Sequence, residues 1–175
     1  MSDAATLARH RAAWQARPEL RAVYREWFDR LLAAVGARRP VVEVGSGPGF
    51  FKERLPSLVA TDVVPGLSVD VRCDADVLPF HSDCVGAIVM VDTLHHLPRP
   101  LDFLSEAARV LKPGGRLAMV EPWITAPSWL LYRYFHHEAC RLGVDVARPF
   151  DSDDKAALDG NAAIPYLLLA KLREA

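Results

Sequence analysis

The chain has 175 residues, of which 51% are hydrophobic, and a formal net charge of -1 at pH 7. This length is typical of one domain, and the apolar content is too high for a disordered protein. The near-zero net charge argues against a dedicated nucleic-acid surface, and no apolar run reaches the roughly 18 residues of a membrane span. We therefore expect neither a nucleic-acid nor a membrane partner.

The chain begins with a helical pattern over residues 4–35, which Pro18 interrupts. Apolar residues recur at spacings of three and four over 20–32, and Gly36 is a suitable C-terminal cap. The period then changes at 41–44, where an almost continuous apolar run predicts a strand buried on both faces of a parallel sheet.

Alternating strand and helix patterns continue downstream. They predict strands at 58–61, 69–73 and 85–91, then a helix at 100–111 and a fifth strand at 116–120. The Lys-Pro-Gly-Gly sequence at 112–115 is expected to end the helix, because proline and glycine both break helices. Strands that alternate with helices and end in polar or glycine-rich loops predict an α/β fold, a Rossmann-like, doubly wound and mostly parallel sheet.

Three glycines, Gly45, Gly47 and Gly49, directly follow the first predicted strand, at the edge where such sheets bind ligands. Glycine allows positive φ and a close ligand approach, and three at alternate positions fit a ligand-free turn poorly. The loop lacks the G-K-[ST] ending of a P-loop, and Phe50 replaces the third glycine of a dinucleotide motif. Pro48 also removes an N–H that a pyrophosphate would use.

Acidic residues follow the next two predicted strands. Asp62 could accept hydrogen bonds from two vicinal ribose hydroxyls, the alternative being a role in a turn. Asp74 could accept from an exocyclic amine, and Leu78 and Phe80 could form an apolar wall for a ring. These residues predict a ligand that is a nucleoside without phosphates.

In this order and spacing, the motifs resemble those of the class I S-adenosylmethionine-dependent methyltransferases, in the small methyltransferase-domain group called type 11. The matching stretches are VVEVGSGPGF, ATD at 60–62, CDADVLPF, LHHL at 94–97 and ARVLKPGGRLAMVEP at 108–122. The resemblance covers roughly residues 41–122 and implies the strand order 3-2-1-4-5, with helices N-terminal to the sheet.

The resemblance implies S-adenosyl-L-methionine as the cofactor. The glycine loop would pack against its methionine part, Glu43 would lie near its ammonium, and Asp62 would hold the ribose hydroxyls. Asp74 would meet the adenine amine, with Val63 and Ala75 beside the ring. The implied cofactor-binding residues are Glu43, Gly45, Ser46, Gly47, Gly49, Asp62, Val63, Asp74, Ala75 and Asp92.

The acceptor side is expected just beyond the fourth strand. Asp92 would line the methionine end of the cofactor, and His95 and His96 would lie where a substrate meets the methyl group. We expect His96, and after it His95, to act as a catalytic base or orienting group; packing of the loop is the alternative. The expected acceptor is a small organic molecule, and a homo-oligomer is one option for the assembly.

The sequence departs from the family pattern at two places. Val85-Gly86 stands where Phe-Asp is usual, which we expect to loosen the packing there. The family fold normally ends with two further strands, whereas about 50 residues remain here, with a single strand-like run at 164–172. We expect one domain over 1–175, made of a helical cap at 1–39, a cofactor-binding core at 40–123 and a shortened part at 124–175.

Other functions stay open on the residues alone. A non-catalytic S-adenosylmethionine-binding or assembly module would suit the short C-terminal part, and a nicotinamide dehydrogenase is disfavoured by Phe50. An amino-directed nucleic-acid methyltransferase would show an Asn/Asp-Pro-Pro-aromatic stretch where Asp92-Thr93-Leu94-His95 stands. Aromatic residues after the fifth strand could form an acceptor wall or pack in the core: Trp123, Trp129, Tyr132, Tyr134 and Phe135.

Metal binding and disulfides are not expected. His136 and His137 are adjacent, so on a helix they would point about 100° apart and chelate poorly, even beside Glu138. The three cysteines are widely spaced, which is typical of a protein of the reducing cytoplasm. The N-terminus lacks the apolar region of a signal peptide, so we expect a cytoplasmic protein.

Overall fold

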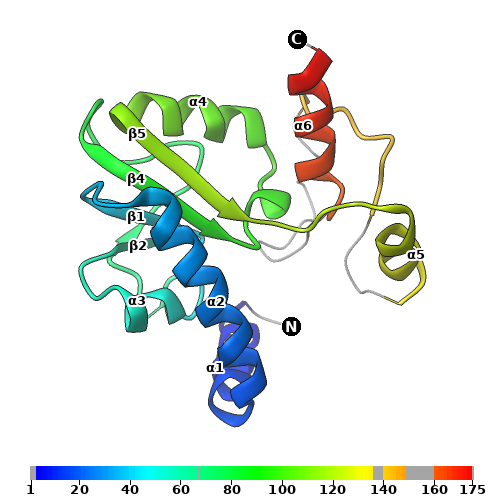
Figure 1. Cartoon of the computed structure of the whole chain (residues 1–175), viewed down its shortest axis with the longest axis horizontal. Helices are drawn as coiled ribbons and strands as arrows, with labels where there is room; N and C mark the ends of the chain where they lie inside the picture. Colours follow the sequence, from blue (N-terminus) through cyan, green and yellow to red (C-terminus); the bar gives the residue numbers. More distant parts are fainter. Residues whose placement is uncertain (1–2, 67, 136–139, 149–159, 175) are drawn as a thin grey trace.

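The structure is a computed structural model that describes residues 3–66, 68–135, 140–148 and 160–174 (Figure 1). Its helices and strands alternate along most of the chain. In chain order they are α1 Asp3–Ala16, α2 Pro18–Val35, β1 Val41–Val44, α3 Phe50–Arg54, β2 Val59–Asp62, β3 Val71–Arg72, β4 Val85–Val91, the 3₁₀ helix η1 Leu94–His96, α4 Pro100–Val110, β5 Leu111–Val120, α5 Ala126–Tyr134 and α6 Ile164–Glu174.

The five strands form one sheet in the order β3-β2-β1-β4-β5, with every neighbouring pair parallel. This confirms the predicted Rossmann-like α/β fold and strand order. All four residues of β1 are buried, as expected for a central strand covered on both faces. Val42 pairs with Val59 of β2 on one side and with Ile88 of β4 on the other.

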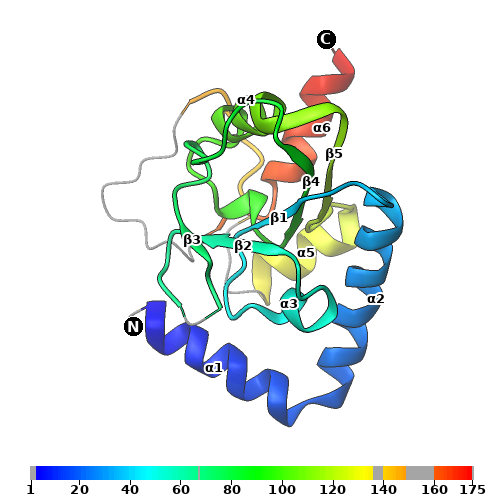
Figure 2. The same ribbon diagram turned by 90° about the vertical axis from the view of Figure 1, so that its left-hand side faces the viewer.

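Helices cover both faces of the sheet, and Figure 2 shows α4 and α6 on one side and α1, α2 and α3 on the other. Successive strand residues point to opposite faces, so each strand feeds both layers. Ala87 and Val89 pack with buried residues of α2 and α3, whereas Ile88 and Met90 pack with those of α4 and α6. The two apolar clusters make a three-layer core.

The N-terminal helices agree with the prediction from sequence. Pro18 separates α1 from α2 and occupies the first turn of α2, where its missing N–H is not needed. Gly36 ends α2 with φ +59, and its N–H donates to the carbonyl of Leu32 at 2.9 Å. None of the described helices is long and apolar enough to cross a membrane.

The fifth strand begins five residues earlier than the sequence predicts. Leu111 already pairs with Val85, and a register shift then absorbs the Pro-Gly-Gly stretch before regular pairing resumes at Arg116 with Ala87. Gly114 has φ +75, which allows this irregularity within the strand. The Pro-Gly-Gly signal therefore marks an irregularity inside the strand, because pairing with β4 outweighs the local breakers.

The sequence predicted a strand-like run at 164–172, but this run lies within the helix α6. Ile164 and Leu168 are buried, whereas Tyr166 and Leu169 are exposed, so burial recurs every four residues instead of every two. In the part of the chain that the structure describes, β5 is the last strand of the sheet.

The expected loosening at Gly86 is also wrong. A Cβ built on Gly86 would lie 2.4 Å from the backbone N of Arg39, so the backbones are already in close contact. The Gly86 N–H donates to the carbonyl of Pro40 at 2.9 Å. The glycine therefore lets the start of β4 pack directly against the segment that enters β1.

Candidate cofactor and acceptor site

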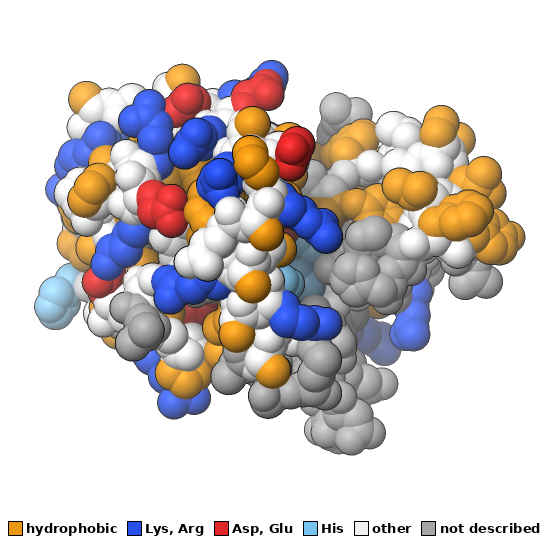
Figure 3. All heavy atoms as spheres, turned by 90° about the horizontal axis from the view of Figure 1, so that it is seen from below, with side chains coloured by type: hydrophobic (Ala, Val, Ile, Leu, Met, Phe, Trp, Pro, Cys, Tyr) orange, Lys and Arg blue, Asp and Glu red, His pale blue; other side chains and the backbone are white. Residues whose placement is uncertain are grey.

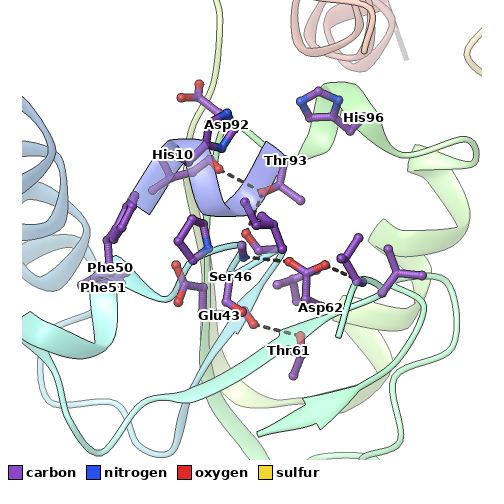
Figure 4. A pocket seen from close by; sticks show the side chains of 18 of the residues that line it. His10, Glu43, Ser46, Phe50, Phe51, Thr61, Asp62, Asp92, Thr93 and His96 are labelled. Carbon is purple, nitrogen blue, oxygen red and sulfur yellow. Dashed lines mark hydrogen bonds between the residues drawn. The ribbon is translucent and has the colours of Figure 1, made fainter. Parts of the chain in front are cut away.

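A pocket of about 570 Å³ opens at the carboxyl edge of the sheet, between the glycine loop and the N-terminal helices. Nine of the ten residues implied as cofactor contacts line it, and Gly49 does not. Figure 4 shows Glu43, Ser46 and Asp62 converging from β1, the glycine loop and β2, with Asp92 and His96 on the other side of the pocket. The fold therefore gathers residues that the sequence spreads over 50 positions.

The glycine loop needs glycine for two different reasons. Gly45 has φ +74, and a Cβ there would lie 2.3 Å from Cγ2 of Thr93, which packs directly on the loop. At Gly49, which has φ +80 and precedes α3, a Cβ would lie 2.1 Å from Cβ of Ser68. Gly45 thus joins the loop to the segment after β4, whereas Gly49 serves packing outside the pocket.

Asp62 holds the glycine loop in place. Its Oδ2 accepts a hydrogen bond from the Gly47 N–H at 2.7 Å, and its Oδ1 accepts from the Val64 N–H at 2.8 Å. A carboxylate oxygen has two lone pairs, so each can still accept a bond from a ligand hydroxyl. The half-buried position of Asp62 on the pocket wall leaves this capacity available.

Glu43 lies in the wall of the pocket at the end of β1 and is 5% exposed. Burial, and then the nearby charge of Asp62, raise the pKa of its carboxyl well above the usual range. Its Oε2 and the Oγ of Ser46 are buried without a hydrogen-bond partner among the described residues. Two such acceptors beside one cavity suit a ligand group that is cationic and donates hydrogen bonds.

The far end of the pocket is more open and less polar. Asp74 is exposed, and its Oδ1 accepts from the Asp76 N–H at 3.1 Å, while Ala75 is buried and Val63 is 47% exposed. Burial raises the pKa of the neighbouring Cys73 thiol. An exposed carboxylate beside apolar surface can meet the amine edge of a flat ring.

Leu78 and Phe80 do not form the wall that the sequence predicted. Leu78 is 2% exposed and belongs to the apolar cluster between the sheet and α4, against which Phe80 packs. The Leu78 N–H donates to Glu106 of α4 at 2.8 Å, which turns this segment toward α4. Neither residue lines the pocket.

The two histidines after β4 lie in different environments. His96 lines the pocket, whereas His95 is 1% exposed and does not. The Nδ1 of His95 lies 2.7 Å from Oε2 of Glu121. Asp92, which has φ +49, also lines the pocket. Positive φ is uncommon for aspartate and turns the chain sharply out of β4.

The N-terminal helices complete the pocket, which the sequence did not predict. Arg11 of α1 donates to the carbonyl of Pro48 at 3.0 Å and to Oγ of Ser68 at 2.9 Å, so α1 is fixed to the glycine loop. Burial, followed by the charge of Asp92, raises the pKa of Tyr24 to about 12. The residues contributed by these helices are Leu7, His10, Ala13, Leu20, Tyr24 and Phe28.

The aromatic residues after β5 do not line the pocket. Trp129 and Tyr132 pack against a small cluster around Ile124, whereas Tyr134 and Phe135 are 66% and 81% exposed. Figure 3 shows hydrophobic side chains gathered over α5, at the right of the view. No group of three metal-ligating side chains occurs among the described residues, and the histidines at 136–137 and Glu138 lie outside them.

Known proteins share these motifs. Residues 42–119 match the family described as "Methyltransferase domain". A ubiquinone biosynthesis O-methyltransferase of Xylella fastidiosa is 32% identical over 111 residues, which are 53% of this chain and 44% of that protein. A ubiquinone/menaquinone biosynthesis C-methyltransferase of Cereibacter sphaeroides is 29% identical over 158 residues, which are 74% of this chain and 63% of that protein.

Among solved structures, a S-adenosylmethionine-dependent methyltransferase of Thermotoga maritima has the same fold. It has a TM-score of 0.52 at 20% identity, and the match covers 69% of this chain and 67% of that one. Over residues 42–119 the chain is therefore similar, in its motifs and its strand order, to the class I S-adenosylmethionine-dependent methyltransferases, whose cofactor is S-adenosyl-L-methionine. The chain spans less than two thirds of the length of the curated relatives it matches.

Proposed function

We propose that the pocket binds S-adenosyl-L-methionine and that the chain transfers the cofactor's methyl group to a small organic acceptor. The observation that carries this proposal is the convergence of Glu43, the glycine loop, Asp62 and Asp74 on one pocket at the carboxyl edge of the sheet. Oε2 of Glu43, which has no hydrogen-bond partner among the described residues, fits the ammonium of the cofactor, and the spare lone pairs of Asp62 fit its ribose hydroxyls.

The cofactor supplies the activated methyl group, so the protein has to bind, orient and exclude water. Glu43 and the glycine loop would hold the methionine end beside Asp92, with the adenine between Val63 and Ala75. The acceptor would enter next to His96, which can orient its nucleophile or take its proton. The nearby side chains of Leu97 and Pro98 make this part of the pocket apolar.

Calorimetric titration with S-adenosyl-L-methionine tests the first half of the proposal, with NADH as the control ligand. We expect saturable binding of S-adenosyl-L-methionine and none of NADH. Absence of S-adenosyl-L-methionine binding would overturn the proposal. Release of S-adenosylhomocysteine in a screen of small organic acceptors then tests the transfer itself.

A non-catalytic cofactor-binding or assembly module is the second candidate. It is favoured by the sheet, which ends at β5 among the described residues, where the family normally adds two strands. This candidate predicts cofactor binding without turnover on any acceptor. The same two experiments therefore separate it from an active transferase.

A further inference from the structure

Glu121 follows β5 directly and aims a buried carboxylate at the segment after β4. Its Oε1 accepts from the backbone N–H groups of Thr93 and Leu94, each at 2.7 Å, and its Oε2 lies 2.7 Å from Nδ1 of His95. The side chains of His95 and Glu121 are 2% and 5% exposed. Because buried charged groups are costly to leave unpaired, these three contacts fix the segment firmly to the end of β5.

His95 touches His96 but is itself shut off from the pocket. The two ring centroids are 4.1 Å apart with the planes tilted by 39°. The backbone N–H of His96 donates to the carbonyl of Thr93 at 2.9 Å. His96, which lines the pocket, is thus contacted at its ring by His95 and at its backbone by Thr93. Glu121 binds both of these neighbours.

The C-terminal segment packs on the same two rings. A Cβ built on Gly160 would lie 2.7 Å from Cδ2 of His95 and 2.9 Å from Nδ1 of His96, so the glycine backbone is in close contact with both. The Asn161 N–H donates to the carbonyl of His95 at 2.9 Å. Gly160 therefore restricts the histidine rings from the side of α6.

We infer that Glu121 is a positioning residue for methyl transfer: through His95 and the backbone of Thr93 it holds the His96 imidazole in place at the pocket. The inference rests on the proposed function, in which His96 meets the acceptor. His95 then affects methyl transfer only through its contact with His96. A carboxylate that receives Nδ1–H of a histidine fixes both the tautomer and the orientation of that ring, which suits a supporting role.

The test is a double-mutant cycle between Glu121→Gln and His96→Ala. Glutamine keeps the volume and one acceptor oxygen for the Thr93 and Leu94 N–H groups but removes the charge that faces His95. We expect Glu121→Gln to lower kcat about tenfold or more while the Kd for S-adenosyl-L-methionine stays within about twofold. In the His96→Ala background the same change should lower kcat by less than about twofold, because its effect passes through His96.

Glu106→Gln is the matched control. Glu106 also accepts a backbone N–H, that of Leu78 at 2.8 Å, but lies away from the pocket on α4. Its variant should keep kcat, so a general loss of packing would not imitate the expected result. Unchanged kcat in Glu121→Gln, or additive losses in the double variant, would overturn the inference.

Two further measurements keep the test decisive. If Glu121→Gln does not fold, Gly160→Ala presses one methyl group on the His95–His96 pair with Glu121 intact, and kcat should again fall about tenfold. If the wild-type chain binds the cofactor but shows no turnover, the proposed transfer fails separately. The imidazole NMR signals of His96 then decide: they should shift in Glu121→Gln, and unchanged signals would contradict the inference.

Discussion

At the scale of single residues, the pocket depends on carboxylates in unlike environments. Glu43 is buried, and one of its oxygens has no partner in the part of the chain that the structure describes. Asp62 is half-buried and bound to the loop backbone, and Asp74 is exposed. Burial favours the neutral form of a carboxyl group, whereas N–H donors favour its anion. The environments of the three acids therefore suit different ligand groups: a cationic group at Glu43, a pair of hydroxyls at Asp62 and the amine edge of a ring at Asp74.

The first prediction concerns Asp62. Replacing it by alanine should weaken the binding of S-adenosyl-L-methionine by about 1–3 kcal/mol, because bonds to the ribose and the support of the Gly47 N–H are both lost. Calorimetry measures the change. Asp70→Ala is the control, since Asp70 also accepts a backbone N–H, that of Ala60 at 2.8 Å, but does not line the pocket. Equal affinities in the two variants would remove Asp62 from the site.

A second prediction follows from the raised pKa of Glu43. Between the usual glutamate range and that raised pKa, the folded protein binds a proton that the unfolded chain releases, so stability falls as pH rises. Glu43→Gln should remove this decrease in the free energy of unfolding, which is up to about 1.4 kcal/mol per pH unit. Chemical denaturation across pH measures it, and Glu19→Gln, the same change at an exposed position, should leave the pH dependence intact.

Glu43 should also make cofactor binding depend on pH. A cationic ligand group prefers the ionised carboxylate, so affinity for S-adenosyl-L-methionine should rise as pH rises through the raised pKa. In Glu43→Gln the affinity should be lower and should no longer change across that range. A wild-type affinity that is flat with pH would show that Glu43 does not face the ammonium.

Residue positions were predictable where they lie near the carboxyl end of a strand or directly after it. Glu43 and Asp62 belong to linear motifs, Asp92 follows β4, and parallel strands bring their carboxyl ends to one edge. His10 and Tyr24 were missed, because they reach the pocket from helices whose sequence gives no sign of what they cover. The pairing of Glu121 with His95 was also missed, because nothing in the linear sequence links a residue that follows β5 to a side chain in η1, 26 positions earlier.

At the scale of elements, the glycine loop is both a strained turn and a packing surface. Gly45 and Gly47 both have positive φ, which costs other residues roughly 1–2 kcal/mol. They differ in surroundings, because among the described residues a Cβ on Gly47 would meet only Leu7, at 3.8 Å, whereas one on Gly45 would overlap Thr93. A side chain at position 47 would therefore meet backbone strain alone, whereas one at position 45 would meet backbone strain and steric overlap together.

Gly47→Ala should lower the free energy of unfolding by about 1–2 kcal/mol, and Gly45→Ala by clearly more. Adding Thr93→Ala to Gly45→Ala removes the two closest Thr93 atoms, Cγ2 and Oγ1, and should recover part of the difference. Thermal or chemical denaturation of the cofactor-free protein measures these changes. Equal losses in the two single variants would show that overlap with Thr93 is relieved without cost.

Elements were predictable where local pattern and pairing agree. Apolar patterning located α2, β1 and β4 correctly, because α2 buries one helical face and the two strands are continuous apolar runs that are buried almost throughout. It failed at the start of β5, where pairing with β4 extends the strand through a Pro-Gly-Gly sequence. It failed again at α6, where a short apolar run fits either period and only its neighbours decide.

At the scale of the whole molecule, the described C-terminal residues pack into the same core as the sheet. Val146, Ile164 and Leu168 belong to one buried cluster with residues of β1, β4 and α4. The buried side chain of Asn161 joins the two C-terminal stretches, since its Oδ1 accepts from the Arg141 N–H at 2.9 Å. We therefore expect the cap, the cofactor-binding core and the C-terminal part to unfold together.

Ile164→Ala tests this expectation. Ile164 is fully buried between α6 and the sheet, so the loss of its side chain should cost about 2–5 kcal/mol of unfolding free energy. Leu169→Ala, on the same helix but 45% exposed, should cost less than about 0.5 kcal/mol. In denaturation followed by fluorescence and circular dichroism, Ile164→Ala should shift one shared transition. A separate early transition would instead show that α6 unfolds independently of the sheet.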